Sequence, residues 1–128
     1  MLARYKIPRG KVEMREFPLP EGIRQDVRHR CFPKHPLAPK PEMVEKYFAN
    51  PTSEGRRRFR SEYEKLLEKN YSERRSEVDA LAEKASASDV YVGCSCPTKA
   101  NPDVNHCHTV IALQFMKKKY PKLEVQFP

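Results

Sequence analysis

No hydrophobic run in this sequence is long enough to cross a membrane, and its first residues, MLARYKIPRG, lack the apolar stretch of a signal peptide. We therefore expect a cytoplasmic protein with no membrane partner. In that reducing environment the four cysteines are expected to be free thiols or metal ligands rather than disulfides. The sequence also contains no internal repeat and no low-complexity tail.

The length and charge of the chain narrow the choice further. At 128 residues with 38% hydrophobic content, the chain is long enough for one domain with a single modest core. The net charge is +8, from 25 lysines and arginines against 17 acidic residues. The basic residues form clusters at 28–30, 56–60 and 117–119. This balance favours a nucleic acid or a phosphorylated ligand as partner, although basic runs on helices are more often only solvated.

The N-terminal third predicts two short strands. Residues 2–7 alternate weakly in polarity, and residues 23–28 place Ile23 and Val27 among arginines. Between them, residues 11–21 contain two prolines and are expected to cross the surface as an extended connection. Residues 32–41 contain four prolines and predict a rigid loop.

The rest of the chain alternates between helical and strand patterns. We expect four helices: one at 42–49, one that begins at a cap at Thr52 or Ser53 and runs to about 70, one at 73–85 with Ser72 as its cap, and one at 104–120. Strands are expected at 89–94 and 123–127. Strands separated by helices favour an α/β fold. The prediction is one domain over 1–128, with a mainly parallel or mixed sheet of about four strands flanked by helices in a Rossmann-like two-layer or three-layer arrangement.

Reactive side chains concentrate in residues 90–111, VYVGCSCPTKANPDVNHCHTVI. This stretch holds three cysteines and two histidines, namely Cys94, Cys96, Cys107, His106 and His108. The loops that follow parallel strands meet at one edge of a sheet, where ligands bind. We therefore expect this loop to face the loop at 28–35 across one crevice.

A metal site is the first interpretation of the cluster. Cys94 and Cys96 are two residues apart, so their side chains leave an extended chain on the same side. With Cys107 and one imidazole they would complete a tetrahedral zinc site. Neighbouring helical residues fan out by about 100°, so only one of His106 and His108 is assigned to the metal. The plain alternative is an interaction domain whose thiols serve only for packing.

A thiol enzyme is the second interpretation. Cys107 is expected near a helix N-terminus, where the helix dipole stabilises a thiolate. A nearby histidine would act as base, and Arg28 or Arg30 would hold an anionic substrate. Phosphatase chemistry is not supported, because the residue five positions after Cys107 is Leu113 rather than arginine.

An anion site is the third interpretation. It would combine the N-terminus of the last helix with Arg28, Arg30 and Lys99. The loop 97–105 lacks glycine and contains two prolines, so it does not have the build of a phosphate cradle.

Part of the chain resembles a known family. Residues 37–67, LAPKPEMVEKYFANPTSEGRRRFRSEYEKLL, and the later helix beginning at His106 are similar to the domain-of-unknown-function 488 family of bacterial and archaeal proteins. The resemblance covers about three quarters of the chain and implies an α/β fold. It implies no reaction, because the family has none established. The cysteines around positions 94–96 and 107 mark a divergent branch with cysteine and histidine at the site.

Overall fold

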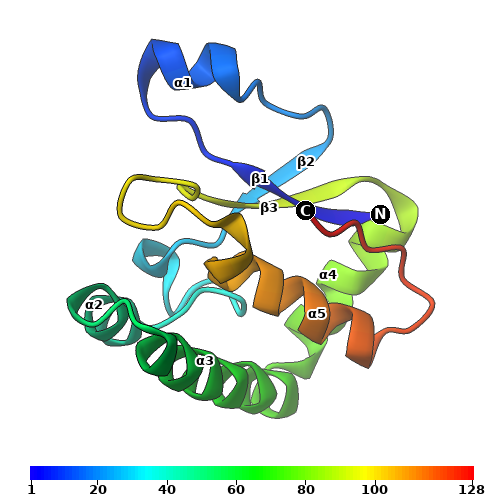
Figure 1. The fold of residues 1–128 in the computed structure, drawn as a ribbon. Helices are drawn as coiled ribbons and strands as arrows, with labels where there is room; N and C mark the ends of the chain where they lie inside the picture. The colour runs from blue at the N-terminus through cyan, green and yellow to red at the C-terminus, as the bar shows by residue number, and fades with distance from the viewer.

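The computed structural model describes residues 1–128, and a parallel three-stranded sheet lies at its centre (Figure 1). The strands are β1 (Leu2–Lys6), β2 (Ile23–Asp26) and β3 (Val90–Cys94), arranged in the order β1-β3-β2. Both pairings with β3 are parallel. The predicted α/β class is confirmed, with a sheet of three strands rather than about four. The predicted final strand is reduced to a single bridge between Leu2 and Val125.

Five α-helices and two short 3₁₀ turns connect and cover the strands. They are α1 (Gly10–Glu16), η1 (His29–Cys31), α2 (Pro41–Ala49), α3 (Ser53–Glu73), α4 (Arg75–Ala87), η2 (Val104–His106) and α5 (His108–Lys119). None of the helices combines the length and the apolar character needed to cross a membrane.

The helices lie on opposite sides of the sheet, with α1 on one side and α2 to α5 on the other (Figure 1). The chain moves across the sheet in one direction from β1 to β2 and returns in the other from β2 to β3. Crossovers of a single handedness then place their helices on opposite faces. The layer of α2 to α5 supplies the core, whereas α1 buries no residue.

Three predicted boundaries were wrong. The segment expected to be extended forms α1, because its prolines stand at 18 and 20, beyond the helix end. Ser72 lies inside α3 instead of capping the next helix. The predicted helix at 104–120 is divided into η2 and α5, with Cys107 as the N-cap residue between them. Thr52 caps α3 as predicted, since its hydroxyl accepts a hydrogen bond from the amide of Gly55 over 3.1 Å.

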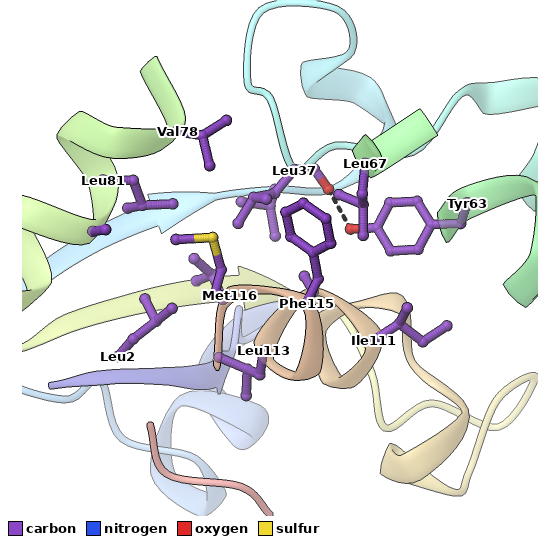
Figure 2. Close-up of a cluster of buried hydrophobic side chains, with 14 of the residues drawn as sticks. Leu2, Leu37, Tyr63, Leu67, Val78, Leu81, Ile111, Leu113, Phe115 and Met116 are labelled. Atoms are coloured by element: carbon purple, nitrogen blue, oxygen red, sulfur yellow. Dashed lines mark hydrogen bonds between the residues drawn. The ribbon is translucent and has the colours of Figure 1, made fainter. Parts of the chain in front are cut away.

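The core lies between α3, α4, α5 and the sheet (Figure 2). The stripe predicted on α3 is buried, and α5 buries nearly its whole first two turns. Burying each large aliphatic side chain contributes about 1.5–3 kcal/mol. Tyr63 is fully buried and its hydroxyl donates to the carbonyl of Leu37 over 2.6 Å. This bond attaches the proline-rich loop to the core.

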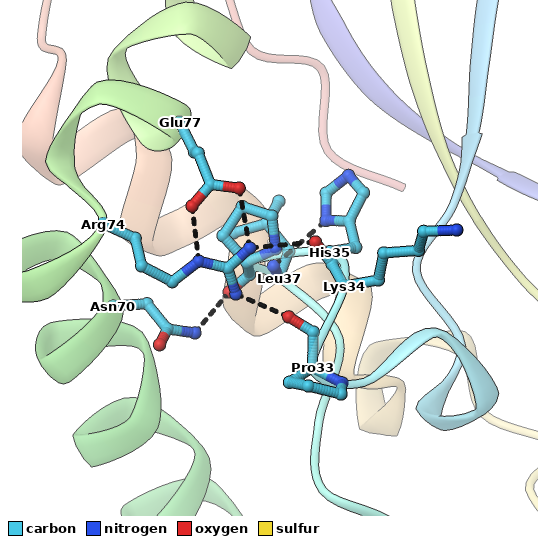
Figure 3. Close-up of polar contacts among 8 residues, drawn as sticks. Pro33, Lys34, His35, Leu37, Asn70, Arg74 and Glu77 are labelled. Atoms are coloured by element: carbon cyan, nitrogen blue, oxygen red, sulfur yellow. Dashed lines mark hydrogen bonds and ion pairs between the residues drawn. The ribbon is translucent and has the colours of Figure 1, made fainter.

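The same loop is held from outside by α3 and the residue that follows it (Figure 3). Arg74 donates to the carbonyls of Pro33 and Lys34 over 2.6 and 2.8 Å. Its guanidinium is held in turn by Glu77 at 2.6 Å. Asn70 donates to the carbonyl of Pro36 over 2.8 Å. These bonds fix the loop after β2, which includes Arg28 and His29 on the side that faces the cysteines.

Candidate metal centre

The cysteine cluster lies where the parallel strands end. Cys94 is the last residue of β3 and pairs with Lys6, the last residue of β1. The preceding Gly93 lies under the ring of Tyr5, and a Cβ there would come within 2.5 Å of a ring carbon. Only glycine lets the two strands and this ring approach so closely. The close packing fixes the direction in which β3 leads into the cysteine loop.

Three sulfur atoms come together in this region. The Sγ atoms of Cys94, Cys96 and Cys107 all lie within 4.8 Å of one another. Their residues are 8%, 7% and 1% exposed, and they form a buried cluster separate from the main core. The fourth cysteine, Cys31, is half-buried and lies outside the group.

His108 is the histidine that faces the sulfurs. Its Nδ1 lies 3.9 Å from Sγ of Cys94 and 4.0 Å from Sγ of Cys107. Its Nε2 lies 2.8 Å from the carbonyl oxygen of Val27, so Nε2 carries the proton and donates it. The Nδ1 lone pair is therefore directed at the cluster. His106 instead lies 3.6 Å from a carboxylate oxygen of Asp103, with its side chain 36% exposed.

Two of the sulfurs receive hydrogen bonds from neighbouring polar side chains. The amide Nδ2 of Asn101 donates to Sγ of Cys96 over 3.2 Å, while its Oδ1 accepts from the hydroxyl of Tyr47 over 3.3 Å. The hydroxyl of Thr109 donates to Sγ of Cys107 over 3.2 Å. Donors of this kind stabilise a sulfur that carries negative charge.

The first strand supplies two cations to the same region. Nε of Arg4 donates to the hydroxyl of Thr109 over 2.8 Å, and its Nη2 donates to the carbonyl of Cys96 over 2.7 Å. The ammonium of Lys6 donates to the carbonyl of Pro97. The sequence patterns did not predict that Arg4 and Lys6 contact this region. Both residues are more than 90 positions away from their partners along the chain.

The three thiols differ in acidity. Hydrogen bonds from Cys94 and Cys96 hold the pKa of the Cys107 thiol well below its ordinary value. The same contacts raise the pKa of Cys94 to about 11 and also raise the pKa of Cys96. Burial opposes protonation of His108, but the adjacent charge of Cys107 outweighs it and raises the imidazole pKa.

A cavity of about 260 Å³ opens onto the cluster. It is lined by residues from the loop after β2, including Arg28 and His29, and by the three clustered cysteines at the end of β3 and in the loop that follows. Arg30 is exposed and does not line this cavity, and Lys99 lines a different hollow. Of the predicted anion-binding residues, the structure brings only Arg28 to the cysteines.

The donor set fits a soft divalent metal. In a tetrahedral zinc site with Zn–S bonds of about 2.3 Å, neighbouring ligand atoms lie roughly 3.5–4 Å apart. The distances from the His108 nitrogen to two sulfurs fall in this range. The backbone carbonyl that accepts from the other ring nitrogen is the usual outer partner of a metal-bound histidine. Three thiols are therefore available for one ion, and the imidazole of His108 lies beside two of them.

Comparison with protein families gives one match. A family model described as the active DUF488-N3 subclade matches residues 13–120. Neither the comparison with curated proteins nor the comparison with solved structures finds a match. Because the matched residues make up most of the chain, the protein belongs to this DUF488 family, as the resemblance of its central segment predicted.

Proposed function

We propose that this DUF488 protein binds zinc through Cys94, Cys96, Cys107 and His108. The observation that carries the proposal is the convergence of three buried sulfurs with an imidazole whose other nitrogen is already hydrogen bonded. Packing alone does not require three buried thiols beside the Nδ1 atom of His108. A reducing compartment such as the cytoplasm would keep these thiols available for the metal.

The bound metal would act first on the structure of the site. Its ligands come from the end of β3, from the loop after it and from the first turn of α5. Four protein ligands close the coordination sphere, which is typical of a structural zinc site rather than a catalytic one. Binding would therefore fix the loop 95–107 and with it one wall of the adjacent cavity.

Metal analysis of protein purified without chelator tests the proposal. We expect about one zinc per chain, and we expect Cys96→Ser to lose most of it. Cys31→Ser is the matched control, because Cys31 lies outside the group, and it should keep its zinc. Substitution with cobalt should give the intense absorption of a tetrahedral thiolate site. Sub-stoichiometric zinc and iron in the unmodified protein would refute the proposal.

A second candidate function is thiol-dependent catalysis by Cys107. Two observations favour it: Cys107 is the N-cap residue of the twelve-residue helix α5, and it lines the cavity together with Arg28. Here Cys94 and Cys96 would donate to the thiolate, and Arg28 would hold an anionic substrate.

The reactivity of the thiol separates the two candidates. A nucleophilic Cys107 should be alkylated by iodoacetamide at pH 6 faster than an ordinary thiol, and Cys107→Ala should abolish that reaction. A zinc-bound cluster should resist alkylation until a chelator is added. If Cys107 reacts at pH 6 no faster than an ordinary thiol after metal removal, the catalytic candidate should be dropped.

A further inference from the structure

The cavity next to the cysteines has two walls of different chemistry. One wall consists of apolar side chains from α2 and α3, namely Val44, Tyr47, Phe48 and Phe59. The rings of Tyr47 and Phe48 lie 5.5 Å apart, and those of Tyr47 and Phe59 lie 5.7 Å apart. Phe48 is 45% exposed, so its ring is accessible to a ligand. These aromatic rings form a surface on which a planar group can pack.

The remaining lining carries basic side chains and no carboxylate. Arg9, Arg28, His29 and His106 border the cavity, and none of its sixteen lining residues is aspartate or glutamate. The first turn of α5 also meets the cavity, and the positive end of the helix dipole favours negative charge there. The two arginines therefore favour an anionic ligand over a cationic one.

Arg28 is held in place for such a contact. Its Nε and Nη2 donate to the carboxylate of Asp26, which does not line the cavity, at distances of 2.7 to 3.2 Å. Its Nη1 has no hydrogen-bond partner within the chain. A guanidinium fixed on one side and free on the other is suited to hold a phosphate or carboxylate.

We propose that this cavity binds a small ligand made of a single planar ring with an anionic substituent, the ring packing on Phe48 and Tyr47 and the anion on Arg28. The volume of about 260 Å³ lies just below the usual range for small-molecule pockets, roughly 300–1,000 Å³, so a dinucleotide is too large. The inference concerns other side chains than the metal ligands, and it stands if the site holds no zinc.

Calorimetric titration with phenyl phosphate tests this inference on the full chain as purified. We expect a Kd below about 1 mM, at least about tenfold tighter than for inorganic phosphate, which lacks the ring, and for benzyl alcohol, which lacks the charge. Arg28→Gln and Phe48→Ala should each weaken binding at least about tenfold. Zinc content measured on the same samples reports on the metal proposal separately.

Matched controls complete the experiment. Arg58→Gln removes an exposed arginine of α3 that does not line the cavity, and Phe127→Ala removes a ring that is 48% exposed in the C-terminal segment. Both variants should bind phenyl phosphate as the unmodified protein does. If Arg28→Gln does not fold, Phe48→Ala and its control decide the question. Absence of binding, binding equal to that of inorganic phosphate, or equal losses in variant and control would overturn the inference.

Discussion

The Nε2 of His108 donates to the carbonyl of Val27 over 2.8 Å, which joins the first turn of α5 to the end of the β2 segment. This bond fixes the imidazole tautomer and leaves Nδ1 facing Cys94 and Cys107. The ring also packs edge-on against Tyr63, with ring centroids 5.6 Å apart. His108 thus connects the core, the β2 loop and the sulfur cluster.

His108→Ala should therefore lower zinc affinity more than any change at His106. We expect a loss of at least about tenfold, because one ligand is removed, together with a fall in stability of about 2 kcal/mol from the lost packing and hydrogen bond. Competition with a chromophoric chelator measures the affinity, and urea unfolding measures the stability. His106→Ala is the control, since His106 contacts Asp103 rather than a sulfur. Equal losses in the two variants would contradict the assignment of His108 as ligand.

Asn101→Ala should weaken metal binding without removing a ligand. Asn101 is 4% exposed and donates to Sγ of Cys96. Loss of an outer partner of this kind typically costs about 10–100-fold in metal affinity. The same chelator competition checks this value. Asn105→Ala changes an exposed asparagine of the same loop and should leave the affinity unchanged. An unaltered affinity in Asn101→Ala would show that the sulfur gains nothing from this donor.

The sequence patterns were sufficient for the parts of the molecule that depend on local order. The continuous apolar run at 90–94 predicted the central strand, and the spacing of Phe59, Tyr63 and Leu66 predicted the buried stripe of α3. The sequence analysis placed Cys94, Cys96 and Cys107 in one group, and the structure brings their three sulfurs within 4.8 Å of one another. The strand and the helix stripe follow from residues close together in the sequence.

The side chains that hold the hydrogen-bond partners of the sulfurs could not be predicted in this way. Arg4 and Tyr47 reach the cluster from β1 and α2, and nothing in their local pattern distinguishes them from other polar residues. The choice between His106 and His108 also required the structure, because it depends on η2 ending before Cys107. Contacts between distant segments depend on how the sheet and helices pack. They leave no periodic pattern that could be recognised in a single sequence.

The basic residues of α3 and α5 give a prediction about nucleic acid. Arg57, Lys65 and Lys118 line one open hollow between these helices and form no ion pair. We propose that they contact phosphates. Binding of a random-sequence DNA duplex should then weaken with salt, with a slope of about −3 on a double logarithmic plot for three phosphate contacts. Fluorescence anisotropy at several salt concentrations measures it.

Single substitutions test whether these residues carry the contact. Arg57→Gln and Lys118→Gln should each reduce the magnitude of that slope by about 1. Lys11→Gln, on α1 and away from the hollow, removes the same charge and should leave the slope unchanged. No detectable binding at low salt would end this proposal. An equal effect of Lys11→Gln would show that only the net charge of the chain attracts DNA.

His35 gives the protein a stability that depends on pH. Burial, helped by the nearby charge of Arg74, lowers the pKa of this imidazole to about 4. In its neutral form Nε2 donates to Oε1 of Gln25 over 2.7 Å, and Nδ1 accepts from the amide of Leu37 over 3.1 Å. Protonation of Nδ1 would place a hydrogen against that amide. The folded state therefore binds a proton on His35 only at a lower pH than the unfolded state does.

Stability should consequently fall as the pH decreases from about 6.5, the ordinary pKa of histidine, towards 4. In this window the unfolded chain binds the proton and the folded chain does not, which costs about 2–3 kcal/mol by the lower end. Urea unfolding at pH 7 and pH 4.5 measures the change. His35→Asn removes the titrating group while its Oδ1 can still accept from Leu37, so the variant should be less stable at pH 7 but lose less on acidification. Because His29, His106 and His108 remain in both proteins, the difference between the two pH dependences isolates His35. Parallel pH dependences would show that His35 does not carry this loss of stability.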